Sequence, residues 1–187
     1  VYIGCAGGKT TYATFTYNKE NTPDNYFWFK AQVNGLNGGH SASEINKGLG
    51  NANKILNRYL WEVNKKIGLV LAEIDGGNLH NAIPREAYAI AGVPYNKKED
   101  IIVLLNTMAP ELEAEVKAID PNLKIQVTST DTPTFVVDRT TSDNLLNAVY
   151  VCPHGVLGMS TDIPGLVETS TNLASIKMKE NDTIVVG

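Results

Sequence analysis

The strongest constraint on the fold is a long helical repeat in the first third of the chain. Over residues 43–67, apolar side chains recur at steps of three and four, which predicts an amphipathic helix with one buried face. These positions are Ile45, Leu49, Ala52, Leu56, Tyr59, Val63 and Ile67. Ser41 and Glu44 have the spacing of a capping box, so we expect Ser41 to be the N-cap. The lysines and glycine of 65–68 are typical of a helix end.

Alternating and apolar stretches on both sides of this helix predict strands. We expect strands at 10–17, 26–34, 69–75, 82–93 and 123–130, and further helices at 97–119 and 141–151. The first two strands are expected to form a hairpin, and Pro110 is expected to break or kink the second helix. We expect a loop at 152–165 and a last hairpin formed by 165–180 and 183–187.

This order of elements predicts an α+β fold. We expect a two-layer sandwich, a mainly antiparallel sheet with helices packed on one face, as an elaboration of the ferredoxin-like arrangement. No linker interrupts the chain, so we treat residues 1–187 as one domain. VYIG opens in mid-strand and TIVVG stops soon after a new strand begins, so we expect a fragment of a longer protein.

Charge and cysteine content exclude several classes of partner. The net charge is −4 and the pI is about 5.4, which argues against binding to nucleic acid or to an anionic membrane surface. No apolar run approaches the length of a membrane span. Cys5 and Cys152 lie far apart without the spacing of metal ligands, which indicates reduced thiols and a cytoplasmic protein.

Most of the short motifs have a simple structural interpretation. AGGKT at 6–10 is similar to a phosphate-binding loop, but the Walker pattern requires glycine where Ile3 stands, and a strand follows. The three histidines are scattered, so we expect no metal site within the chain. The turn at 78–84 gathers Asn78, His80 and Asn81, residues that turns favour for backbone reasons. His154 is expected to be an exposed loop residue.

His40 follows Gly38 and Gly39 and precedes the predicted N-cap Ser41. A helix N-terminus disfavours imidazolium and attracts anions, so His40 has the setting of a neutral hydrogen-bond donor. The alternative is a side chain that packs over the start of the helix. From the residues alone the packing role is favoured, because loop histidines are common.

Four stretches in sequence order change this interpretation. GCAGG (4–8), GGHSASEINKGLGNANK (38–54), GGNLHNAIPRE (76–86) and GLVETSTNLA (165–174) resemble aminoacyl-histidine dipeptidases, also called Xaa-His or cytosol nonspecific dipeptidases. Members of this family carry a catalytic domain with two zinc ions, interrupted by an inserted lid domain. The chain resembles that lid, or dimerisation, domain, and it matches none of the family's metal ligands.

The resemblance implies roles for two residues. His40 matches a lid histidine that binds the substrate carbonyl and stabilises the oxyanion, and Asn81 matches an asparagine that holds the substrate. An arginine that receives the substrate carboxylate would follow Gly187. The family usually has glycine where Ala42 stands, a small departure.

The resemblance therefore implies a zinc dipeptidase that hydrolyses Xaa-His dipeptides. Its active centre would combine the lid with a flanking catalytic domain, and the isolated fragment would be inactive. A non-catalytic dimerisation or ligand-binding module is the alternative. A third hypothesis, a free-standing nucleotide-binding domain, is supported by AGGKT alone.

Overall fold

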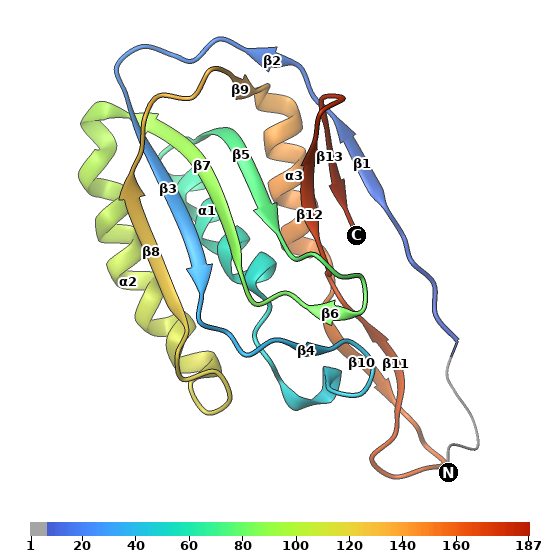
Figure 1. Ribbon diagram of the computed structural model, residues 1–187. Coiled ribbons are helices and arrows are strands. Elements are labelled where there is room, and N and C mark those ends of the chain that lie inside the picture. The colour runs from blue at the N-terminus through green and yellow to red at the C-terminus, as the bar shows by residue number, and fades with distance from the viewer. Residues whose placement is uncertain (1–6) are drawn as a thin grey trace.

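A seven-stranded antiparallel sheet organises the chain, and three helices cover one of its faces (Figure 1). This computed structural model describes residues 7–187. In sheet order the strands are β1 (Ala13–Thr16), β13 (Thr183–Val186), β12 (Ile176–Lys179), β5 (Val70–Gly76), β7 (Ala87–Pro94), β3 (Tyr26–Asn34) and β8 (Lys124–Ser129). The helices are α1 (Ala52–Lys66), α2 (Lys98–Val116) and α3 (Arg139–Val151), with single 3-10 turns η1 (Ile45–Lys47) and η2 (Tyr95–Lys97). The predicted α+β sandwich is confirmed.

A ferredoxin-like unit forms one side of this sheet, from β5 to the edge strand β8. Its elements follow the chain as β3-α1-β5-β7-α2-β8, and its strands lie in the order β5-β7-β3-β8. This is the split β-α-β arrangement, in which each helix returns the chain across the same face of the sheet. Strands β12, β13 and β1 then extend the sheet beyond β5.

Three short antiparallel ribbons lie outside the large sheet. They are β2 (Lys19–Glu20) with β9 (Val136–Val137), β4 (Gly39–His40) with β6 (Ala82–Ile83), and β10 (Gly155–Met159) with β11 (Val167–Thr171). The β4–β6 and β10–β11 ribbons lie at one end of the sheet, and β2–β9 lies at the other end (Figure 1).

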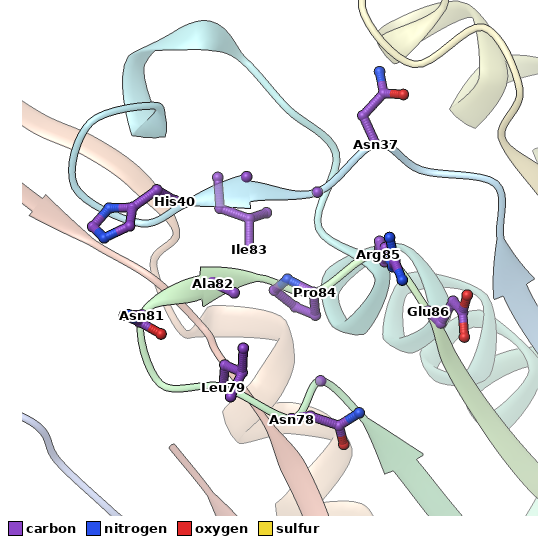
Figure 2. A pocket seen from close by; sticks show the side chains of 13 residues that line it. Asn37, His40, Asn78, Leu79, Asn81, Ala82, Ile83, Pro84, Arg85 and Glu86 are labelled. Atoms are coloured by element: carbon purple, nitrogen blue, oxygen red, sulfur yellow. The ribbon is translucent and has the colours of Figure 1, made fainter.

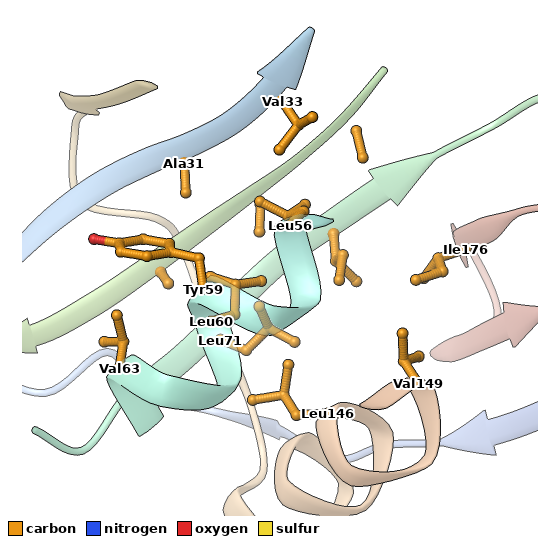
Figure 3. Close-up of a cluster of buried hydrophobic side chains, with 14 of the residues drawn as sticks. Ala31, Val33, Leu56, Tyr59, Leu60, Val63, Leu71, Leu146, Val149 and Ile176 are labelled. Carbon is orange, nitrogen blue, oxygen red and sulfur yellow. The ribbon is translucent and has the colours of Figure 1, made fainter. Parts of the chain in front are cut away.

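Helix α1 supplies the centre of the hydrophobic core. Leu56, Tyr59, Leu60 and Val63 are almost fully buried, as the helical period predicts. Figure 3 shows them between side chains of the sheet and those of α3. The Tyr59 hydroxyl donates to the carbonyl of Ile101, so the one polar atom of this group is satisfied.

The predicted start of this helix is wrong. Helix α1 begins at Ala52, and its N-cap is Asn51, whose side chain accepts from the N–H of Lys54. The preceding segment forms only the turn η1, because Gly48 takes a left-handed φ of 72° that ends it. Ile45 has the helical spacing, but it is the first residue of η1 and is buried from there, outside α1.

Strand partners also differ from the prediction. Strand β1 pairs with β13 instead of forming a hairpin with β3, because β7 and β8 occupy both edges of β3. The strand expected at 82–93 is divided into β6 and β7, since Pro84 turns its carbonyl to the N–H of Ala52. The stretch expected to be a loop contains β10, so β11 pairs with β10, and only β12 and β13 form the last hairpin.

Pro110 does not interrupt the second helix, which runs on from Lys98 to Val116. The carbonyl that loses its partner belongs to Asn106, and both residues lie on the exposed face of the helix, so the lost bond does not leave a buried polar group. The strand expected at VYIG, Cys5 and the first part of GCAGG lie outside the described residues. Within residues 7–187, no helix has both the length and the apolar character needed to cross a membrane.

Candidate functional site

The ribbon of β4 and β6 brings His40 and Asn81 together. His40 lies opposite Ala82, and the N–H of Ser41 donates to the carbonyl of Asn81 over 2.9 Å. Both side chains are exposed, and Figure 2 shows them at the same end of the ribbon. The two residues singled out in the sequence therefore belong to one surface, although they come from segments on either side of α1.

An open cavity of about 520 Å³ lies along this ribbon. Its lining comes from the two strands and from the segments that flank them, and includes His40, Asn78, Asn81, Arg85 and Glu86 (Figure 2). The lining combines hydrogen-bonding and charged groups with apolar side chains, the composition of a site for a small polar ligand.

The ring of His40 is oriented by the turn that follows it. Its Nδ1 accepts from the backbone N–H of Ala42 at 3.1 Å and of Ser43 at 3.4 Å. Because Nδ1 is the acceptor, the proton of the neutral ring lies on Nε2. His40 thus presents an N–H donor away from the turn. The helix N-terminus expected behind it is absent, so this turn, and no helix dipole, sets the tautomer.

Glu44 holds the backbone of His40 in a reciprocal pair of bonds. Its Oε2 accepts from the N–H of His40 at 2.8 Å, and its own N–H donates to the carbonyl of His40 at 3.1 Å. The ammonium of Lys47 binds the other carboxylate oxygen at 2.8 Å. This bond, followed by that from His40, lowers the pKa of Glu44, so the carboxylate stays charged at neutral pH.

The two glycines before His40 meet two different steric demands. Gly38 has a φ of 65°, which side chains other than that of glycine rarely allow. A Cβ on Gly39 would lie 2.5 Å from Cδ1 of Leu49 and 3.0 Å from Oε2 of Glu44. The pair therefore permits the sharp entry into β4 and the close approach of Glu44.

Residues distant in sequence fix the turn that carries Asn81. The Nδ2 of Asn172 donates to the carbonyl of Ala82 at 2.8 Å. The ammonium of Lys177 donates to Asn78 at 2.8 Å and to Asp75 at 2.7 Å. Asn172 and Lys177 were not identified as site residues in the sequence. The only signal was that Asn172 belongs to the quoted stretch GLVETSTNLA.

His154 is half-buried instead of exposed as expected. Its Nδ1 lies 3.1 Å from Nδ2 of Asn51 and accepts from the N–H of Leu173 at 3.4 Å. Burial, with a smaller effect of the nearby Lys54 ammonium, lowers the pKa of His154 to about 4. A neutral His154 therefore joins the cap of α1 to the segment before β12.

The remaining candidates do not form a reactive cluster. His80 is exposed and lines a second cavity, of about 450 Å³, together with Ser41 and Asn78. Cys152 is a partly exposed free thiol. Over residues 7–187, no three His, Cys, Asp or Glu side chains are close enough together to hold a metal ion.

Comparison with known proteins identifies the family of this domain. The family model described as the peptidase dimerisation domain matches residues 25–120, which contain both strands of the His40 ribbon. The cytosol non-specific dipeptidase of Escherichia coli (strain K12) is 35% identical over 182 residues, covering 97% of this chain and 38% of that protein.

Among solved structures, the aminoacylhistidine dipeptidase of Vibrio alginolyticus superposes with a TM-score of 0.89 at 31% identity. The match covers 94% of this chain and 36% of that one. The chain thus spans little more than a third of the length of either relative. It belongs to the family of peptidase dimerisation domains, and it is similar to the domains of this kind in these two dipeptidases.

Proposed function

We propose that this chain is the lid domain of a longer dipeptidase and supplies substrate-binding groups to an active site completed by a flanking catalytic domain. The observation that carries the proposal is the pairing of His40 with the Asn81 turn beside a polar cavity. The likeness to two dipeptidases supports peptide hydrolysis, and their names support a dipeptide as substrate. The name of the Vibrio alginolyticus relative supports the Xaa-His type. The name of the Escherichia coli relative supports a cytosolic location.

His40 has the chemistry of an oxyanion donor. When water attacks a peptide carbonyl, negative charge develops on the carbonyl oxygen, and a fixed N–H group binds this oxygen more strongly than it binds the substrate. The Nε2–H of His40 is such a group, because the turn at Ala42 and Ser43 holds Nδ1 as the acceptor. Asn81 would bind the substrate backbone through its exposed amide.

The zinc ions implied by the resemblance find no ligand set among residues 7–187. We assign them to the catalytic domain and derive no step through them. The 187-residue chain alone would then bind substrate groups without hydrolysing a peptide.

Replacement of His40 in the full-length protein tests the proposal. Loss of one oxyanion donor typically lowers turnover by about 10²–10³-fold. We expect His40→Ala to lower kcat by this order while the melting temperature stays within about 2 °C of wild type, since the side chain is exposed. His80→Ala is the matched control, because this exposed histidine lies on the adjoining turn. A kcat within a few-fold of wild type in His40→Ala would refute the role.

We also propose that the domain forms homodimers. Strand β8 supports this assignment, because it pairs with β3 on one side and leaves its other edge free among the described strands. A free edge can pair with a second copy about a two-fold axis. Sedimentation at micromolar concentration should show a dimer of the full-length protein, and a strict monomer would contradict the proposal.

A further inference from the structure

The segment that carries His40 is a loop closed at its base by one buried carboxylate. Asp120 is 1% exposed, and its two oxygens accept from the two ends of the loop. Oδ1 accepts from the N–H of Asn37 at 2.7 Å, and Oδ2 accepts from the N–H of Gly50 at 2.7 Å. Strand β4 with His40 lies between these two ends, close to the first.

Asp120 itself is fixed by the end of α2. Its N–H donates to the carbonyl of Val116 at 2.8 Å, and its carbonyl accepts from the N–H of Leu123 at 3.2 Å. The neighbouring Ile119 adds a second tie, because its carbonyl accepts from Nδ2 of Asn37 at 2.7 Å. The carboxylate is thus fixed in the segment between α2 and β8, outside the loop that it closes.

The chemistry of this carboxylate is unusual for a buried acid. Within the described residues, no lysine, arginine or histidine forms an ion pair with Asp120. A buried charge is costly unless its lone pairs are satisfied, and bonds from N–H groups to a charged oxygen are stronger than bonds to a neutral one. The two loop ends therefore provide the stabilisation that Asp120 requires, and Asp120 in return fixes both ends.

The loop has a few other long-range contacts, which include the ribbon of β4 with β6 and the packing of η1 against β10. Ile45 is buried, and Gly48 lies against Ile119, where an added Cβ would be 3.1 Å from Cδ1. Apart from these contacts and the ribbon with β6, the hydrogen bonds around His40 are internal to the loop, such as the bond from the N–H of His40 to Glu44. If the base opens, the internal bonds move together with the loop, and the position of His40 then depends on the ribbon with β6 and on the packing of η1.

We propose that Asp120 is a positioning residue, which sets the place of His40 by tethering both ends of its loop. This inference rests on the proposed function of His40. An asparagine at this position keeps the shape but has one oxygen, and its amide N–H₂ would face one of the two backbone donors. Asp120→Asn therefore releases one end of the loop, and an error of about 1 Å in a catalytic group can lower turnover by about 10²-fold.

Asp138 offers a matched control at the opposite end of the domain. Its carboxylate also joins two backbone N–H groups, those of Asn18 at 2.8 Å and Thr141 at 2.9 Å. It caps α3 beside β9, far from the β4–β6 ribbon (Figure 1). Asp138→Asn removes the same kind of tether without touching the proposed site.

The experiment compares both variants in the full-length protein by hydrogen exchange, steady-state kinetics and thermal unfolding. We expect Asp120→Asn to speed exchange of peptides covering 37–50 by at least about tenfold, and to lower kcat by a similar factor with a smaller change in KM. Asp138→Asn should lower the melting temperature but leave kcat and exchange at 37–50 within about twofold of wild type. Asp120→Glu keeps the charge and shifts it by one methylene, so it should give an intermediate kcat. It replaces Asp120→Asn in the experiment if that variant does not fold.

A double variant separates this inference from the function on which it rests. If Asp120 acts through His40, Asp120→Asn should lower kcat no further in the His40→Ala background. Unchanged exchange at 37–50 in the Asp120 variants would overturn the tether. Faster exchange with wild-type kcat, while His40→Ala is impaired, would overturn the positioning role. A normal kcat in His40→Ala alone would refute the proposed function, and exchange would still decide the tether.

Discussion

Protonation of His154 should destabilise the folded chain in mild acid. The ring is half-buried, its Nδ1 accepts from Leu173, and burial lowers its pKa from about 6.5 to about 4. Because the unfolded chain binds a proton at higher pH than the folded chain does, the free energy of unfolding falls as the pH drops. This contribution of His154 is complete above about pH 6.5 and is lost progressively as the pH falls to about 4.

The two pKa values set the size of the effect. At 1.36 kcal/mol for each unit, the full difference corresponds to about 3 kcal/mol. The ring retains partial contact with solvent, which reduces the expected loss to about 2 kcal/mol. The charge of Lys54 lowers the pKa of His154 further, in the same direction as burial.

Urea denaturation of the 187-residue chain measures this difference. His154→Asn keeps an oxygen acceptor for the N–H of Leu173 and removes the titration. Between about pH 7 and about pH 4.5, wild type should lose about 2 kcal/mol more stability than His154→Asn. His80→Gln, which removes an exposed histidine, should follow wild type. The same pH dependence in wild type and His154→Asn would refute the reasoning.

Two further substitutions test contacts that hold the site end of the domain. Gly77→Ala should destabilise the chain by more than about 2 kcal/mol, because φ is 67° and the new Cβ would meet the carbonyl of Ala174. Urea denaturation measures this loss. Gly158→Ala is the control, because no atom lies close to the position of its new Cβ. Lys54→Met should lower the free energy of unfolding by about 1–2 kcal/mol, because the ammonium donates to three carbonyls at the end of α3. Lys66→Met, at the exposed end of α1, is the control and should change it little in the same assay.

The core of the fold could be predicted because its pattern is local. The period of three and four over Leu56, Tyr59 and Val63 gives one apolar face, and that face is the one buried on the sheet. The start of α1 could not be placed by period alone, because Ile45 has the same spacing while it packs from η1, outside α1. Gly48 and the cap Asn51 were the better signals, since both act on the backbone directly.

The site was predictable to a smaller extent. Period and composition did not single out His40 and Asn81. The resemblance to a family implied a role for each, and the ribbon of β4 and β6 brings them together. Asp120 and Asn172 were beyond sequence reasoning. Each acts through a hydrogen bond to a residue more than 65 positions away, and no local pattern records such a bond.

The tautomer and the position of His40 depend on different parts of the chain. The turn at Ala42 and Ser43 sets which nitrogen carries the proton, and it would do so wherever the loop lay. Asp120 and the strand β6 set where that nitrogen lies, through bonds that do not touch the ring. A change at the base of the loop should therefore displace the ring while its Nε2–H stays a donor. A change within the turn should leave the ring in place and change which ring nitrogen carries the proton. The two classes of variant should therefore differ in hydrogen exchange even where kcat falls equally.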